Sequence, residues 1–295
     1  MKPVNFDYYA PSSVDEALDT LAELGYDGKV LAGGQSLIAA MNFRMARPSA
    51  LVDLNNVPEL SYINPTADGG LAIGTMTRVS TVEYSQEVIK RFPLLIEVAK
   101  YIAHPQIRRR GTFGGAIAHA DPAGQLPSIS MVMNMQALIK GKGKERWVDA
   151  PDLIIGPFMT VIEPDEMLAE LVIKPLPART GTKYVQVSRQ SGGYAQSAVA
   201  SIVTLDENET CNDVRMVLMS VAEVPILSEK AREILIGNKP TKDAIEAVAE
   251  AAATGEIDPA TDLHASADYR RSITRVLIVR CLTEAFERAK NGGKL

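Results

Sequence analysis

The sequence predicts an α+β protein built from three successive units. Three observations support this fold class. Helix and strand candidates alternate at the N-terminus, mixed strands and helices follow up to Pro175-Leu176-Pro177, and alternating strands followed by helices fill the rest. We therefore expect an N-terminal α/β subdomain over residues 1–57, a second α+β subdomain over 58–176, and a C-terminal domain with a three-stranded sheet and helices over 177–295.

The first unit opens with a helix signal. Ser13-Val14-Asp15-Glu16 is a capping box, a pattern in which Ser and Glu side chains satisfy N–H groups at the start of a helix, and Gly25 is placed to end that helix. An apolar run at Val30 predicts a strand, the residues after Ser36 predict a second helix, and residues 51–54 predict another strand.

In the second unit, Asp68-Gly69-Gly70 joins two strand candidates at residues 62–63 and 71–73. A second capping box, Ser80 with Glu83, and an apolar run over 94–99 predict two helices. Three further strands are expected, at residues 137–139, 153–155 and 167–173.

The third unit is expected to be a sheet followed by helices. Alternating apolar and polar residues predict three antiparallel strands, at 184–187, 198–205 and 214–221, with a hairpin loop at 206–209. Helical periodicity then predicts helices at 228–236, 241–253 and 266–289.

Two glycine-rich loops carry the functional signal. Leu31-Ala32-Gly33-Gly34-Gln35-Ser36 lies between a predicted strand and a predicted helix, and Gly111-Thr112-Phe113-Gly114-Gly115 has similar residues. Each pairs glycines, which let a ligand approach the backbone N–H groups, with a hydroxyl. The first loop alone is also compatible with a plain turn. Together the loops predict a clamp for a diphosphate, although the nucleotide motifs G-x-G-x-x-G and G-x-x-x-x-G-K-[ST] are absent.

Composition narrows the class of protein. The net charge of −5 argues against a nucleic-acid-binding surface, and no apolar stretch approaches the length of a membrane span. The N-terminal residues lack the apolar core of a secretory signal, so we expect a cytoplasmic protein.

The chain offers few groups for metal binding or acid–base catalysis. Cys211 and Cys281 are too few to hold an iron–sulphur cluster and are expected to be buried, inert thiols. His104, His119 and His264 have no metal-binding spacing. Since no nucleophile motif or recognisable carboxylate pair is found either, we assign no catalytic residue and no metal ligand. Arg108-Arg109-Arg110 precedes the second loop, either as a solvated turn or as positive potential beside a diphosphate.

Several motifs in order resemble a known family over the whole chain. They lie at residues 6–18, in the first glycine loop, and at 51–54, 73–77, 104–108, 112–115 and 121–127. The chain resembles the FAD-binding medium subunit of the molybdenum hydroxylase, or xanthine dehydrogenase, family, as found in carbon monoxide dehydrogenase. This resemblance implies a two-subdomain FAD-binding fold of the vanillyl-alcohol-oxidase (PCMH) type, with FAD in the cleft between the first two units and the C-terminal sheet over the flavin ring.

The resemblance also implies the residues that bind the cofactor. The pyrophosphate and ribityl end would contact Leu31, Ala32, Gly33, Gly34, Gln35, Ser36, Leu37, Thr112, Gly114 and Gly115. Asp121 and Gln125 would lie near the ribityl chain, and Leu168 and Tyr194 near the ring. Ala116, Gln125 and Gly192-Gly193 depart from the family pattern, so the ring end matches less closely than the phosphate end.

The implied function is that of an electron-transfer flavoprotein subunit. In this family, [2Fe–2S] clusters lie on a small subunit and a molybdenum pterin on a large one, and the medium subunit passes electrons to an external acceptor. The expected assembly is a heterotrimer, paired as a dimer of trimers. Two alternatives stay open at this point: a free-standing FAD-dependent oxidoreductase and a non-catalytic assembly subunit. Substrate and acceptor are not specified by these residues.

Overall fold

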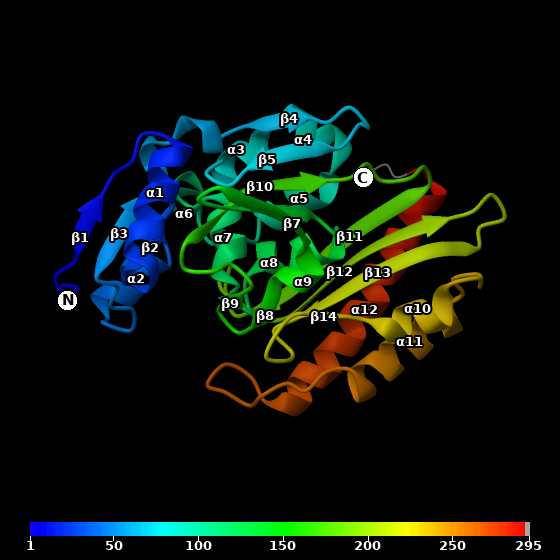
Figure 1. Ribbon diagram of the computed structural model, residues 1–295. Helices are drawn as coiled ribbons and strands as arrows, with labels where there is room; N and C mark the ends of the chain where they lie inside the picture. Colours follow the sequence, from blue (N-terminus) through cyan, green and yellow to red (C-terminus); the bar gives the residue numbers. More distant parts are fainter. Residues whose placement is uncertain (293–295) are drawn as a thin grey trace.

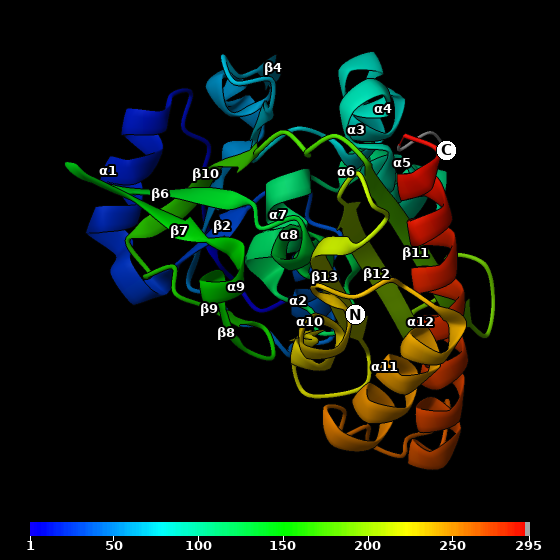
Figure 2. The same ribbon diagram turned by 90° about the vertical axis from the view of Figure 1, so that its right-hand side faces the viewer.

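The computed structural model describes residues 1–292, so the last three residues of the predicted third unit lie outside it. Three main sheets and the helices between them are stacked in layers (Figures 1 and 2). Within the described residues, no helix combines the length and apolar composition that a membrane crossing requires. The three sheets fall within residues 7–53, 63–173 and 180–227. The unit boundaries at 57 and 176 stay a prediction.

The first unit is a small parallel sheet with one long helix. Its strands, in the order β1-β3-β2, are β1 (Asp7–Tyr9), β2 (Gly28–Leu31) and β3 (Ala50–Asp53), and its helices are α1 (Val14–Leu24) and α2 (Leu37–Asn42). Short 3₁₀ turns follow at Gly25–Asp27, Leu54–Asn56 and Pro58–Leu60. Ser13 caps α1 as predicted, because its hydroxyl accepts from the N–H of Glu16. The Glu16 carboxylate instead accepts from the N–H of Ser12, at 2.7 Å.

The second unit is a five-stranded antiparallel sheet with helices on both faces. Its strands, in the order β4-β5-β10-β6-β7, are β4 (Ile63–Pro65), β5 (Leu71–Gly74), β10 (Glu166–Ile173), β6 (Gln136–Gly141) and β7 (Lys144–Asp149), and a separate hairpin pairs β8 (Ile154–Gly156) with β9 (Met159–Thr160). On one face, Met167 and Ala169 of β10 pack with α1, and on the other, Leu171 and Ile173 face the main core.

The helices of this unit are short. They are α3 (Val79–Tyr84), α4 (Gln86–Arg91), α5 (Pro93–Ala99), α6 (Pro105–Arg110), α7 (Phe113–His119), α8 (Gln125–Val132) and α9 (Ala150–Leu153). The predicted Ser80–Glu83 capping box is wrong. Helix α3 starts after Arg78 without a side-chain cap, and Glu83 is buried against Arg108. Three helices, not two, cover residues 79–99, because the hydroxyl of Ser85 starts a new one.

The third unit is an antiparallel sheet covered by helices on one face. Its strands are β11 (Thr180–Ser188), β12 (Ala195–Leu205), β13 (Cys211–Met219) and β14 (Ile226–Leu227), in that order, so the structure adds one short strand to the three predicted. Helices α10 (Glu229–Leu235), α11 (Lys242–Gly255) and α12 (Ala267–Lys290) pack on its outer face. Its inner face packs on the helices of the second unit (Figure 2).

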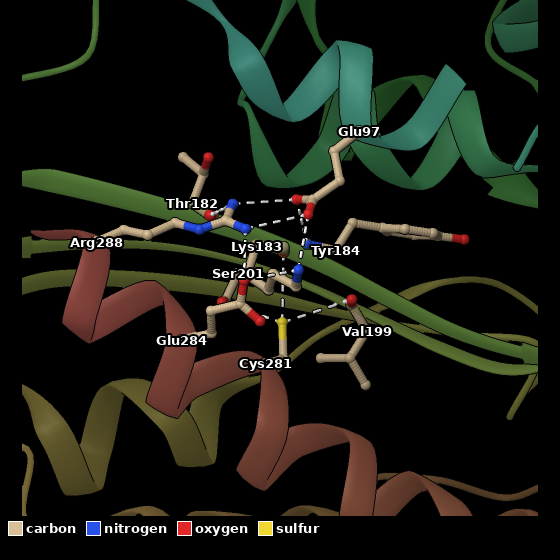
Figure 3. A network of polar contacts seen from close by, with 9 residues as sticks. All are labelled: Glu97, Thr182, Lys183, Tyr184, Val199, Ser201, Cys281, Glu284 and Arg288. Carbon is tan, nitrogen blue, oxygen red and sulfur yellow. Dashed lines mark hydrogen bonds and ion pairs between the residues drawn. The ribbon is translucent and has the colours of Figure 1, made fainter. Parts of the chain in front are cut away.

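A polar network joins the second and third units (Figure 3). Lys183 of β11 donates to Glu97 of α5 at 2.8 Å and to Glu284 of α12 at 2.9 Å. Arg288 of α12 pairs with the same two carboxylates, at 3.2 and 2.6 Å. The network holds the last helix against a helix of the second unit, because Glu97 accepts from both cations.

Candidate cofactor-binding site

The two glycine loops are in contact, although they are distant in the sequence. A Cβ at Gly33 would lie 2.4 Å from the carbonyl oxygen of Arg110 and 2.7 Å from the Cα of Gly111. A Cβ at Gly115 would lie 3.0 Å from the Cβ of Ala32. Only glycine at position 33 permits this approach of two backbones. The fold therefore brings together the two segments that the sequence predicts as one clamp.

The first loop leaves its backbone donors free. It follows β2 and ends where the N–H of Ile38 donates to the carbonyl of Gly34, a residue with φ of 72°. In the described part of the chain, the N–H groups of Gly33, Gly34, Gln35 and Ser36 have no protein acceptor, and the exposed Ser36 hydroxyl makes no capping bond. Clustered N–H groups of this kind suit the oxygens of a phosphate.

The second loop differs from the sequence prediction, since its N–H groups are already bonded. Phe113 donates to the carbonyl of Thr77 at 2.8 Å, Gly114 to the carbonyl of Thr75 at 3.0 Å, and Gly115 to the hydroxyl of Thr112 at 3.1 Å. Thr112 is thus the N-cap of α7. The expectation of bare N–H groups is therefore wrong for Gly114 and Gly115, which contribute close backbone packing instead.

Two predicted residues follow the second loop. Asp121 comes just after α7, and one of its carboxylate oxygens accepts from the N–H of Ala123 at 2.9 Å. Gln125 is buried at the start of α8, where its amide donates to the side-chain oxygen of Gln186 at 3.1 Å and more weakly to the carbonyl of Tyr101. The N–H₂ group of Gln125 therefore faces the third unit and is engaged by protein groups.

The two residues predicted for the ring end lie in contrasting places. Leu168 is 4% exposed and belongs to the core between the sheet and the helices. Tyr194 lies in the exposed β11–β12 connection beside Asp121, and partial desolvation together with that carboxylate raises the pKa of Tyr194 to about 12. In the same connection Gly192 packs so closely on His104 that a Cβ would lie 2.8 Å from the ring. This connection therefore rests on the second unit near Asp121.

Sequence reasoning missed two residues beside the clamp. The side-chain amide of Asn55 donates to the carbonyl of Ala32 at 2.9 Å, and the guanidinium of Arg78 donates to Asn55 at 2.6 Å and to the carbonyl of Arg110. No local signal could have found them, because each bond joins residues at least 23 positions apart.

The arginines near the second loop have two different roles. Arg108 forms a buried two-point ion pair with Glu83, at 2.7 and 3.1 Å, so it is structural. Within residues 1–292, Arg78 and Arg110 pair with no carboxylate. Burial and the nearby Arg110 charge lower the pKa of Arg78. The buried Asp53 carboxylate offsets this in part, but two neighbouring arginines that form no ion pair, close to unpaired N–H groups, still favour an anionic ligand.

Comparison with known families places both halves of the chain. Residues 4–177 match the FAD binding domain in molybdopterin dehydrogenase, and residues 182–285 match the CO dehydrogenase flavoprotein C-terminal domain. The free donors, the glycine contact and the positive charges described above fit a cofactor that carries a diphosphate, as FAD does.

Similar proteins align over nearly the full chain. The 6-hydroxypseudooxynicotine dehydrogenase complex subunit alpha of Paenarthrobacter nicotinovorans is 40% identical over 98% of this chain and 97% of its own length. The carbon monoxide dehydrogenase medium chain of Hydrogenophaga pseudoflava is 37% identical, over 98% of this chain and 99% of its own.

Solved structures agree with these matches. A structure of carbon monoxide dehydrogenase from Hydrogenophaga pseudoflava superposes with a TM-score of 0.94 at 37% identity, covering 98% of this chain and 99% of that chain. Quinoline 2-oxidoreductase from Pseudomonas putida 86 superposes with a TM-score of 0.91 at 32% identity, with the same coverage of both chains.

Proposed function

This chain belongs to the FAD-binding medium subunits of the molybdenum hydroxylase family, and from that premise we propose that it is the electron-transfer subunit of a heterotrimeric hydroxylase or dehydrogenase. In this role the subunit receives electrons from [2Fe–2S] clusters on a partner subunit and passes them to an external acceptor. When bound, FAD supplies the redox chemistry, because its isoalloxazine ring accepts and releases electrons. The residues of this chain bind and orient the cofactor.

The contact between the two glycine loops is the observation that carries the proposal. The first loop, Leu31 to Leu37, would donate its free N–H groups and the Ser36 hydroxyl to the pyrophosphate oxygens. Thr112, Gly114 and Gly115 would form the opposite wall, where the bare glycine backbone lets the cofactor lie close to α7. The charges of Arg78 and Arg110 favour the same ligand.

At the other end of the cofactor, we assign Asp121 and Tyr194 to the edge of the ribityl and ring site, since they lie beside one another at the junction of two units. Gln125 and Leu168 would support that end from within. Gln125 does so through its bond to Gln186 of the third unit, and Leu168 through the core below.

The remaining redox centres would lie on other chains. A [2Fe–2S] cluster needs four protein ligands, usually cysteines, and this chain has Cys211 and Cys281, both buried in the third unit. The clusters would lie on a small partner subunit and the molybdenum pterin on a large one. We expect these three subunits to form a dimer of heterotrimers.

The proposal is tested with the protein purified together with the chains that accompany it. Flavin absorbance, iron–sulphur absorbance and two partner chains in one complex would support the proposed function. Flavin on a solitary chain that substrate reduces directly would instead indicate a free-standing oxidoreductase. A complex that assembles without flavin and cannot be reconstituted would indicate an assembly subunit.

Two glycine variants test the clamp itself. Gly33→Val places a side chain on the carbonyl of Arg110 and should abolish FAD retention. Gly255→Val is the matched control, because a Cβ at that position meets no atom within 4 Å. Stoichiometric FAD in the Gly33→Val protein would refute the assignment of these loops to the FAD-binding site.

A further inference from the structure

Two side chains, Arg78 and Asn55, link two backbone carbonyls, one in or beside each glycine loop. Arg78 lies just before α3. Its Nη1 donates to the carbonyl of Arg110, and its Nη2 donates to Oδ1 of Asn55 at a distance of 2.6 Å. Nδ2 of Asn55 donates to the carbonyl of Ala32, at 2.9 Å. A continuous chain of hydrogen bonds therefore runs from the residue before Gly33 to the residue before Gly111.

Both ends of this chain are fixed to parts of the clamp. Ala32 contacts Gly115, and the carbonyl of Arg110 is the atom on which Gly33 packs. A shift of that carbonyl would move the second loop relative to the first. Because Arg78 donates to the same carbonyl, it helps to fix where the two loops meet.

The orientation of Asn55 is itself determined by its neighbours. Its backbone N–H donates to Asp53 at 2.9 Å, and its side-chain N–H₂ group faces both Asp53 and the carbonyl of Ala32. Both neighbours are acceptors, so Oδ1 must face the guanidinium of Arg78. The buried Asp53 carboxylate also accepts from the hydroxyl of Tyr8, at 2.6 Å, which anchors the arrangement to β1.

Besides its hydrogen bonds, Arg78 contributes positive charge to the site. In the described residues its guanidinium forms no ion pair, and burial and the nearby charge of Arg110 lower its pKa, an effect that the buried Asp53 carboxylate partly offsets. A guanidinium has five N–H donors, and two of its nitrogens are engaged by protein groups. This chain of hydrogen bonds through Asn55 and Arg78, which we call the strut, thus places a positive charge near the free N–H groups of the first loop.

We propose that Arg78, held by Asn55, is a positioning residue that sets the spacing of the two glycine loops, and that binding of the FAD pyrophosphate depends on it. This inference rests on the proposed FAD site and adds to it two residues outside both loops. Arg78 acts by fixing the carbonyl of Arg110 and by adding positive potential, whereas Asn55 acts through Arg78 and Ala32.

The test measures equilibrium binding of FAD and of ADP to the full chain stripped of cofactor. Arg78→Met should raise the Kd of both ligands by about 10- to 100-fold, the effect of losing charged hydrogen bonds. ADP is informative because it carries the pyrophosphate without the flavin ring. Arg78→Lys keeps the charge but cannot bridge both acceptors, so its Kd should lie between those of the wild type and Arg78→Met.

Two further variants separate positioning from folding and from general charge. Arg109→Met removes an exposed neighbouring charge outside the strut and should change the Kd less than about twofold. As a single change, Asn55→Ala should weaken FAD binding. In the Arg78→Met background it should add little further loss, because both changes break the same chain of hydrogen bonds. Urea unfolding of each cofactor-free protein should have nearly the wild-type midpoint.

The possible results lead to different conclusions. If the wild-type chain binds neither FAD nor ADP, the proposed function fails and the strut fails with it. If the wild type binds both ligands and Arg78→Met binds them equally well, only the strut is refuted. A loss of binding in Arg78→Met matched by a fall in its unfolding midpoint, with no rescue by Arg78→Lys, would also refute it.

Discussion

Removing Arg108 should destabilise the second unit by about 4 kcal/mol. Its side chain is 8% exposed and that of its partner Glu83 is 9% exposed, and the two groups make a two-point ion pair. Arg108→Met leaves a buried carboxylate without a partner, which costs about 3–5 kcal/mol. The carbonyls of Ile102 and Ala103 also lose donors, at 3.0 and 3.4 Å.

The assay is urea unfolding followed by the fluorescence of Trp147, the single tryptophan, which lies on β7 of the same unit. The double variant Glu83→Leu with Arg108→Met should recover most of the lost stability, because it removes both charges and leaves apolar groups in their place. The reasoning fails if Arg108→Met unfolds within about 1 kcal/mol of the wild type. It also fails if the double variant is less stable than the single one.

Two further outcomes follow from the network in Figure 3. Burial opposes ionisation of Glu284, but Lys183 and Arg288 outweigh it and hold the pKa of Glu284 below its usual 4.5. The contribution of ionised Glu284 to stability should therefore be complete above about pH 4.5 and be lost as the pH falls through its lowered pKa. Acid titrations monitored by circular dichroism should show a smaller loss of stability in Lys183→Met. Burial raises the pKa of the Cys281 thiol to about 12. Iodoacetamide at pH 8 should therefore leave Cys281 unmodified in the folded protein and label it in urea, as measured by peptide mass analysis. Labelling of Cys281 in the native protein would contradict this.

Much of the fold could be predicted because its signals are local. The sequence pattern places strands within β12 and β13, although β12 is buried on both faces rather than on alternate residues. Periodic apolar residues mark α12, and the Ser13 cap marks the start of α1. The strand β1 could not be found this way. It has three residues, all exposed, and depends on pairing with β3 far along the chain.

Some residues of the candidate site could likewise be predicted from the sequence, and others could not. Glycines 33 and 115 stand out in the sequence. The structure explains Gly33 by the contact of two backbones and Gly115 by its closeness to the Thr112 hydroxyl and the Cβ of Ala32. Tertiary packing decided the rest. The N–H groups of Phe113 and Gly114 donate to the carbonyls of Thr77 and Thr75, which follow β5, and no motif marks Asn55 or Arg78.

The network that ends at Arg288 also bears on the order of biosynthesis. Both glycine loops and the strands of the second unit precede residue 177, whereas the cation that completes the network is on the last helix. Since domains fold from the N-terminus as a chain leaves the ribosome, the two cofactor-binding subdomains can form before α12 is synthesised. A ribosome-bound chain that ends before α12 would thus present both glycine loops to the cofactor before the ion pairs of Arg288 have formed.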